Sequence, residues 1–317
     1  MNLNLPILDQ VANCKNLLIA GMGGGFDLFC GLPIYFELRK RGQTVHLANF
    51  SFSDITSFSG GTRLTPTLVG VDANYDRMVI YFPELYLAKW FQEKQDDPVT
   101  IWSFQKTGTA PLLKDYRVLV DHLDIDGILL IDGGVDSLVR GDEEETASLI
   151  EDSTSLFVVN ELQDVPVRLM GCIGLGVELN LTFPQIFENI ANLTKMDGFL
   201  GSCSLAPQMW SYQLYEESVL YVQSQRMQDP SVINSSIISA VRGEYGNHHL
   251  TKKTRGSHLN ISPLMALYWF FDLPAVAEQN LFLSEIADTD TFMDVVQAYI
   301  PFKRGLKVRR NNKIFQP

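Results

Sequence analysis

Short apolar runs separated by glycine-rich turns fill the first two thirds of the chain. Residues 17–20 are apolar throughout, which is typical of a strand buried on both faces of a parallel sheet. A glycine turn follows, and the pattern then predicts a helix over residues 28–41, which Gly42 ends. Residues 44–50 are predicted to form the second strand. This order predicts the opening βαβ unit of a doubly wound α/β domain.

The same alternation continues to about residue 206. It predicts further strands at 78–81, 99–102, 127–131, 167–173 and 197–200, and helices at 84–95, 111–123, 144–162 and 184–193. Later helices are predicted at 208–227, 231–241 and 290–299, with an apolar segment at 264–271 between them. We therefore predict a Rossmann-like α/β core with a mostly parallel sheet and helices on both faces over residues 1–206. A mainly helical part over 207–317 would pack on it, or the whole chain would form one continuous domain.

Composition narrows the classes of partner. The chain has 317 residues, of which 46% are hydrophobic and 20% charged, as in ordinary globular proteins. Its net charge of −12 argues against binding to nucleic acid or to an anionic membrane surface, and leaves small molecules open. The apolar run at 264–271 is too short to span a bilayer. No signal peptide is visible, so we expect a cytoplasmic location. The four cysteines form no C-x-x-C pair, which fits reduced thiols: Cys14, Cys30, Cys172 and Cys203.

Two glycine turns share one pattern. Gly24-Gly25-Phe26-Asp27 and Gly133-Gly134-Val135-Asp136 both read Gly-Gly-apolar-Asp after an apolar strand. The carboxyl ends of parallel strands are where ligands bind in such sheets, so we expect the two turns to face one crevice. The N–H groups of Gly23, Gly24 and Gly25 would hold an anion at a helix N-terminus. The simpler alternative is that each Asp only caps its helix.

The first turn does not match a dinucleotide-binding fingerprint. Phe26 stands where the third glycine would be, and the second strand closes with Asn49-Phe50-Ser51 rather than with an acid for a ribose. The sequence therefore argues against a nicotinamide-dependent dehydrogenase. It favours a general phosphate or small-ligand site.

The second turn points to a metal. Residues 132–137 look like the Ser-Gly-Gly-x-Asp-Ser loop of the PP-loop ATP pyrophosphatases, but Asp132 replaces the serine. A carboxylate there repels phosphate unless a cation intervenes. We therefore expect Asp132 and Asp136 to bind Mg²⁺ or Mn²⁺ or to act as general base, with Asp27 orienting one of them and Glu178 adding a carboxylate. The acids at 142–145 extend this acidic stretch, but for those at 143–145 we favour a solvated helix N-terminus, where acids complement the helix dipole.

Basic residues would balance an anionic ligand. Arg63 ends the polar, glycine-bearing segment 51–63, and Arg255 lies in the segment 246–258, which has the character of a lid. Either arginine would clamp a phosphate or carboxylate, unless these segments are only solvated surface loops. The basic tail at 303–313 is expected to pair with the acidic face of its own chain or with a partner subunit.

Taken together, these motifs resemble the archaeal and bacterial family catalogued as domain of unknown function 1152. The resemblance rests on segments spread along the whole chain: 21–27, 131–143, 150–153, 174–178 and, more loosely, 255–263. It implies a Rossmann-like α/β protein and no particular reaction.

Three functions remain open from the sequence. The first is an enzyme that acts on a nucleotide-like or phosphorylated small molecule by hydrolysis or group transfer, with a divalent metal. The second is a non-catalytic protein that binds or senses a small molecule. The third is an assembly protein, such as a homo-oligomer, that uses its helical half as an interface. A cleft lined by Gly24, Asp27, Gly133 and Asp136 would argue against the third.

Overall fold

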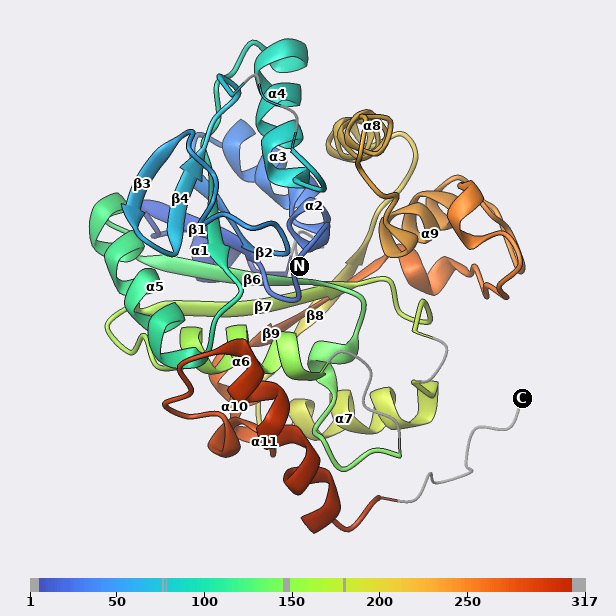
Figure 1. Cartoon of the computed structure of the whole chain (residues 1–317). Helices are drawn as coiled ribbons and strands as arrows, with labels where there is room; N and C mark the ends of the chain where they lie inside the picture. Colours follow the sequence, from blue (N-terminus) through green and yellow to red (C-terminus); the bar gives the residue numbers. More distant parts are fainter. Residues whose placement is uncertain (1–5, 76, 78, 145–148, 179–180, 310–317) are drawn as a thin grey trace.

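The computed structural model describes residues 6–75, 77, 79–144, 149–178 and 181–309. Within these residues, nine strands form one sheet in the order β3-β4-β5-β2-β1-β6-β7-β9-β8 (Figure 1). Its five central strands are parallel: β5 (Ile101–Gln105), β2 (Thr44–Ser51), β1 (Asn16–Gly21), β6 (Gly127–Gly133) and β7 (Val167–Ile173). The strand order reverses between β1 and β6, which is the switch point where doubly wound sheets bind ligands. The predicted α/β fold is confirmed.

One edge of the sheet differs from the prediction. β3 (Thr62–Thr65) and β4 (Leu68–Val71) form a hairpin, and β4 pairs antiparallel with β5. The strand predicted at 78–81 is wrong over its described residues, 79–81, which are irregular. Tyr81 has φ of 42°, a left-handed conformation that no strand contains, and its N–H donates to the carbonyl of Met227 rather than to a neighbouring strand.

The other edge draws on the C-terminal part of the chain. The apolar segment that was predicted at 264–271 supplies β9 (Leu267–Asp272), which lies between β7 and β8 (Phe199–Ser204) and is antiparallel to both. Its run of tyrosine, tryptophan and phenylalanine is typical of a strand. The sheet therefore spans residue 206. The division into two parts at that residue stays a prediction.

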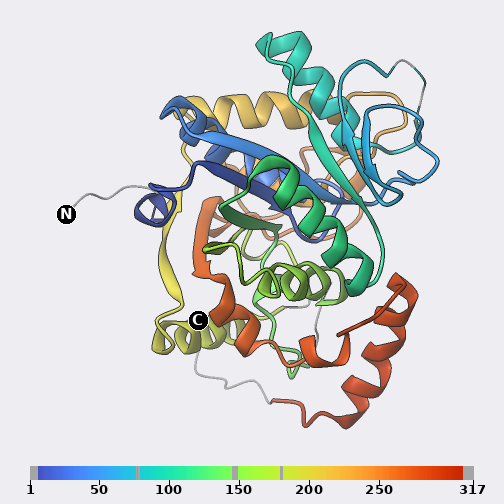
Figure 2. The same ribbon diagram turned by 90° about the vertical axis from the view of Figure 1, so that its left-hand side faces the viewer.

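Helices cover both faces of the sheet (Figures 1 and 2). β1 alternates between the two layers, with Leu17 and Ile19 packed on one side and Leu18 and Ala20 on the other. The first layer contains α1 (Leu8–Val11), α2 (Asp27–Cys30), α3 (Leu32–Lys40), α4 (Pro83–Gln95), α8 (Trp210–Gln223) and α9 (Val232–Val241). The second contains α5 (Thr109–Leu123), α6 (Leu149–Asn160), α7 (Phe183–Lys195), α10 (Leu273–Gln279) and α11 (Phe292–Gly305). The single helix predicted at 28–41 is thus two helices that meet at Gly31.

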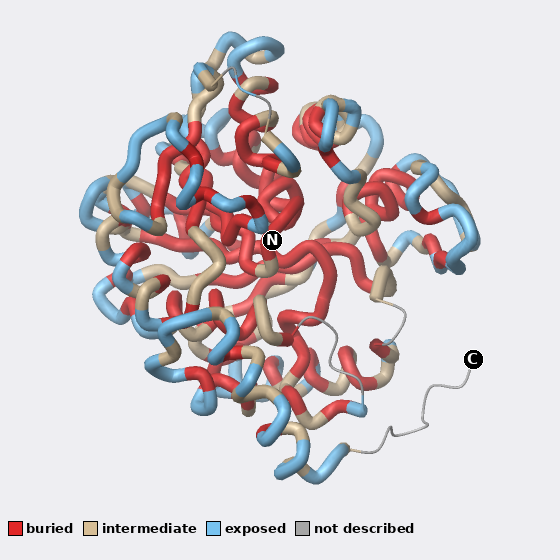
Figure 3. The backbone as a smooth tube through the Cα atoms, viewed as in Figure 1, coloured by how far each residue is buried: buried red, intermediate tan, exposed pale blue. Residues whose placement is uncertain are grey.

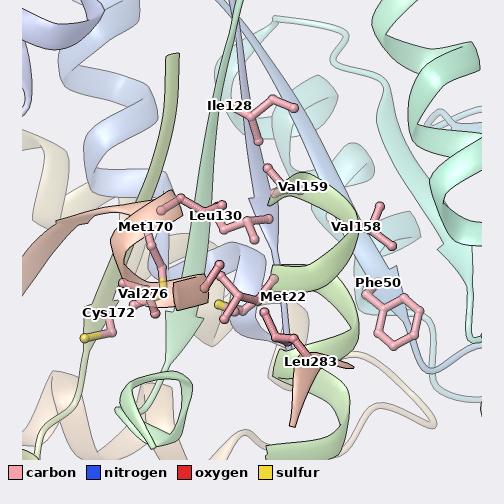
Figure 4. Packing of buried hydrophobic residues seen from close by; sticks show 14 of the residues in the cluster. Met22, Phe50, Ile128, Leu130, Val158, Val159, Met170, Cys172, Val276 and Leu283 are labelled. Atoms are coloured by element: carbon pink, nitrogen blue, oxygen red, sulfur yellow. The ribbon is translucent and has the colours of Figure 1, made fainter. Parts of the chain in front are cut away.

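The buried core reaches the first glycine turn. The central strands are buried along most of their length (Figure 3). Met22, which directly precedes the turn, belongs to the same buried cluster as Leu130 of β6 and Val158 of α6 (Figure 4). The hydroxyl of Ser155 on α6 also donates to the carbonyl of Met22 over 2.7 Å. Helix α6 is therefore fixed against the start of the turn. No helix in the described ranges is long and apolar enough to cross a bilayer.

Candidate functional site

Both glycine turns open onto one pocket at the carboxyl ends of β1 and β6. The pocket has a volume of about 200 Å³. From the first turn it is lined by Gly23, Gly24, Gly25, Phe26 and Asp27, and from the second by Asp132, Gly133 and Asp136. The shared crevice that the two turns predicted is therefore present. Its remaining walls are Phe52, Tyr81, Asp152, Lys253 and residues 230–233.

Three buried carboxylates meet in this pocket. Oxygens of Asp27, Asp132 and Asp152 lie within 4.8 Å of one another. The N–H of Gly23 donates to Asp27 Oδ2 over 2.7 Å, and the N–H of Ser137 donates to Asp132 Oδ2 over 3.1 Å. Asp152 is 2% exposed, no backbone or uncharged side-chain group among the described residues donates to its oxygens, and the side chain within hydrogen-bonding reach is another acid, Asp136. Three hard oxygen ligands in one place match the donor set that Mg²⁺ and Mn²⁺ prefer.

The glycines make room for these acids. A β-carbon on Gly23 would lie 2.5 Å from Asp27 Oδ2 and 2.6 Å from Asp152 Oδ1, and one on Gly133 would lie 2.9 Å from Asp27 Oδ1. Such distances are clashes, so a side chain at either position would displace these carboxylates. The N–H of Gly23, which the sequence assigned to a bound anion, is already engaged by Asp27 of the same chain. The turns therefore pack carboxylates against backbone.

Burial and mutual repulsion shift the acids toward their protonated forms. Burial is the main cause that raises the pKa of Asp27, followed by the charge of Asp132. The pKa of Asp132 and the pKa of Asp152 are raised by burial first and by the charge of Asp136 second. A carboxyl group that is removed from water and surrounded by like charges favours either a proton or a bound cation. The cluster therefore suits a divalent metal that would replace the protons.

Glu178 lies beside the cluster but outside the pocket lining. It follows β7, and its Oε1 would be 2.0 Å from a β-carbon on Gly134, so its carboxyl group packs against the second turn. Burial raises the pKa of Glu178, and the charge of Asp136 raises it further. Gly134 itself has φ of 138°, which favours glycine.

Helix α9 closes the pocket from the C-terminal part of the chain. Pro230, Ser231, Val232 and Ile233 line the pocket, so the N-terminal turn of α9 faces the acids. Asn234 fixes the helix to the first glycine turn: its Nδ2 donates to the carbonyl of Phe26 over 3.2 Å. Its Oδ1 accepts from the hydroxyl of Tyr215 on α8 over 2.9 Å. The first N–H groups of a helix have no intrahelical partner, so this end of α9 carries partial positive charge.

Near the end of β2, Asn49 supports the first glycine turn, whereas a dinucleotide site would have an acid there to bind a ribose. Asn49 is completely buried, and its Nδ2 donates to the carbonyl of Gly25 over 3.0 Å and to Glu84 Oε1 over 2.8 Å. Burial raises the pKa of Glu84. The place of the acid in a dinucleotide site is therefore taken by a residue that holds the first turn.

The two predicted arginines lie away from the pocket lining. The guanidinium of Arg63 donates to the carbonyls of Ile55, Phe58 and Pro66, so it holds its own loop together. Arg255 is exposed. From the same predicted lid, it is Lys253 that lines the pocket, at 3.9 Å from Asp229.

Two acids of the stretch 142–145 bind two basic residues of the C-terminal tail. Arg309 contacts Glu143 over 2.7 Å and Asp142 over 3.2 Å, and Lys303 donates to the carbonyl of Glu143 over 2.8 Å. The tail thus pairs with an acidic segment of its own chain, which was one of the two expectations. Glu145 and the tail beyond Arg309 lie outside the described residues.

Sequence reasoning missed Asp152, Phe52 and Tyr81. Asp152 had a detectable signal, because it shares the buried face of α6 with Leu149, Leu156 and Val159. An acid at helical spacing among core positions is unusual and marks a candidate site. Phe52 and Tyr81 lie in irregular segments, where periodicity gives no signal.

Comparison with known proteins assigns the family. The model described as "Protein of unknown function (DUF1152)" matches residues 90–301, a range that includes Asp132, Asp136 and Asp152 and begins after the first glycine turn. No curated protein and no solved structure matches the chain. Since the matched range covers well over half of the sequence and agrees with the motifs that suggested it, the chain belongs to the DUF1152 family of proteins of unknown function.

Proposed function

We propose that this protein is an enzyme that binds Mg²⁺ or Mn²⁺ in the acidic pocket and acts on a nucleotide-like or phosphorylated small molecule. The observation that carries the proposal is Asp152, a buried carboxylate that no uncharged donor among the described residues satisfies, in reach of Asp27 and Asp132 and beside a further acid, Asp136. Buried carboxylates that repel one another are costly to ionise, so a fold that gathers three of them in one pocket suits a cation. Hydrolysis and group transfer both fit this set of residues.

Each acid has a role in this proposal. Asp27, Asp132 and Asp152 would hold the metal, which when bound would neutralise charge on a phosphate group. Asp136 lines the same pocket and would accept the proton of the attacking water or hydroxyl group. Gly23 and Gly133 keep the carboxylates in place, because any side chain there would displace them.

Another part of the pocket lining suits the anionic part of a substrate. Residues of the N-terminal turn of α9 and Lys253 both line the pocket. Backbone N–H groups at a helix start and a lysine are common phosphate contacts. The pocket thus combines a place for a cation with a place for an anion, which is what a metal-bridged phosphate requires.

A sensing protein is the second candidate. It is favoured by Asn234, which connects the first glycine turn to helices α8 and α9 and would transmit a change at Asp27 to them. Turnover distinguishes the two functions. Both predict a ligand in the pocket, whereas only the enzyme consumes it.

The test is turnover of phosphorylated compounds with Mn²⁺ or Mg²⁺. Nucleotides and sugar phosphates are incubated with the protein, and products are followed by phosphorus NMR. We expect Asp136→Asn to lower the rate on the order of 100-fold or more, as loss of a general base does, while binding is retained. Exposed Asp164 provides the control, Asp164→Asn, which should leave the rate unchanged. Binding without turnover would favour the sensing protein, and the absence of both would contradict the two proposals together.

A further inference from the structure

An exposed aromatic ring stands at the mouth of the acidic pocket. Phe52 directly follows β2 at the carboxyl edge of the sheet and lines the pocket. Its residue surface is 47% exposed, although most phenylalanines of this chain are buried. A single exposed ring is unremarkable on a surface, but this one borders a polar pocket. Its contacts show that its position is fixed.

The ring of Phe52 is held from two sides. A β-carbon on Gly24 would lie 2.4 Å from Phe52 Cε1, so the ring packs directly on the backbone of the first turn. The ammonium group of Lys106 lies over the ring at 4.6 Å from its centre, and also over Phe292 at 3.9 Å. Glu151 holds Lys106 in this place through an ion pair of 2.8 Å. The ring is therefore pre-positioned, with a cation over one face.

Tyr81 brings a second aromatic side chain to the same turn. Its hydroxyl would be 2.9 Å from a β-carbon on Gly25, and Phe52 Cδ2 would be 3.5 Å from that same point. The backbone of Tyr81 has φ of 42°, which is unfavourable for a residue other than glycine. Two hydrogen bonds hold this backbone in place. The hydroxyl of Ser53 donates to the carbonyl of Tyr81 over 2.6 Å, and the N–H of Tyr81 donates to the carbonyl of Met227 over 3.1 Å. Strain that is maintained in this way is common at functional sites.

We propose that Phe52 stacks on the heteroaromatic base of a nucleotide, and that the hydroxyl of Tyr81 bonds to that base or its sugar. This inference rests on the proposed function and narrows its substrate class from phosphorylated molecules to nucleotides. Aromatic rings bind bases through their faces with little dependence on which base is present. The ammonium group of Lys106 over one face disfavours a second cation on the ring, so an electron-rich base suits Phe52 better than an organic amine.

The experiment compares two ligands with the same sugar and phosphate, one of which carries a base where the other has the anomeric hydroxyl. Isothermal titration calorimetry with Mn²⁺ measures the dissociation constants of adenosine monophosphate and of ribose 5-phosphate for the full chain. We expect the nucleotide to bind roughly tenfold more tightly, which is the lower range of one stacking contact. Phe52→Ala and Phe52→Leu should remove this difference without changing the affinity for ribose 5-phosphate. Phe52→Trp should retain it.

Tyr245→Ala is the matched control, since Tyr245 is 80% exposed and lies outside the pocket lining. The inference is overturned if wild type binds both ligands equally, if Phe52→Leu weakens both to the same extent, or if tetramethylammonium competes with the nucleotide in a manner that depends on Phe52. If one of these results is found but ribose 5-phosphate still binds, only the stacking inference is overturned and the proposed function stands. If neither phosphate binds with Mn²⁺, the proposed function fails as well.

Discussion

The carboxylate of Asp152 occupies the space that a side chain on Gly23 would need. A β-carbon on Gly23 would lie 2.6 Å from Asp152 Oδ1, although the two residues belong to a turn and a helix that are far apart in the sequence. Ser155, one turn further along α6, donates to Met22 and so fixes this approach. The first glycine turn and α6 therefore pack together so that the carboxylates of Asp27 and Asp152 lie against the backbone of Gly23.

Gly23→Ala tests this fit. The added methyl group must displace Asp27 and Asp152 together, so we expect loss of Mn²⁺ binding and a fall in the free energy of unfolding of about 1–3 kcal/mol, as overpacking causes. Calorimetric titration and chemical denaturation measure the two effects. Gly305→Ala is the control, because nothing lies within 4 Å of a β-carbon there. Unchanged metal affinity in Gly23→Ala would contradict the proposed arrangement.

Divalent metal should stabilise the wild-type fold. A ligand that binds only the native state adds about 2.7 kcal/mol at a concentration of 100 times its dissociation constant. We expect Mn²⁺ to raise the melting temperature of wild type and to have little effect on Asp152→Asn, which removes a charged ligand at constant shape. Differential scanning fluorimetry checks this. Equal shifts in both proteins would place the metal elsewhere, and no shift in either would exclude the metal proposal.

The pKa shifts predict an unusual dependence of stability on pH in the absence of metal. The native pKa of Asp152 is raised above its ordinary value of 3.8, mainly by burial, so the native state keeps a proton that the unfolded chain releases. Stability is therefore fully present below that ordinary value and falls as the pH rises toward the native pKa, by up to about 1.4 kcal/mol per pH unit. Asp152→Asn should reduce this slope.

Urea denaturation in the presence of a chelator, from about pH 5 to about pH 8, measures the slope. The control is again Asp164→Asn, whose exposed carboxylate should make no difference to it. A slope that is the same in wild type and Asp152→Asn would show that Asp152 is already ionised in the metal-free native protein.

The sequence was sufficient to predict that the two turns meet. Parallel strands that follow apolar runs end at the same sheet edge, so Asp27 and Asp132 follow from the order of elements. Asp152 was not predictable in this way, because which face of α6 approaches the turn depends on the packing of the complete second layer. The aromatic run of β9 is typical of a strand, but its place in the sheet was not predictable, because its partners β7 and β8 are distant in sequence.

Arg309 should matter for the fold more than its position near the C-terminus suggests. It pairs with Glu143, which is completely buried, and also with Glu188 and Asp142. In Arg309→Ala, the carboxylate of Glu143 keeps the backbone N–H groups of Arg140 and Gly141 and the amide of Asn189 but loses its cation. We therefore expect a loss of about 2–4 kcal/mol in the free energy of unfolding. Arg304→Ala is the control because Arg304 is exposed. A loss of the same size in both variants would show that general charge, not this network, stabilises the tail.

Asn234 connects the stability of α9 to the geometry of the acids. It is 1% exposed, and its amide satisfies the carbonyl of Phe26 and the hydroxyl of Tyr215, both buried. Asn234→Ala leaves these groups without that partner, at a cost of about 1–3 kcal/mol for each unsatisfied group. Since Phe26 directly precedes Asp27, we also expect weaker Mn²⁺ binding. Calorimetry compares Asn234→Ala with Ser236→Ala, whose buried hydroxyl donates to the carbonyl of Val232 within α9, and so separates a loss of stability from a loss of Mn²⁺ binding. If Asn234→Ala loses stability but keeps full metal affinity, α9 supports the fold without positioning Asp27, and the route proposed for a sensing protein is excluded.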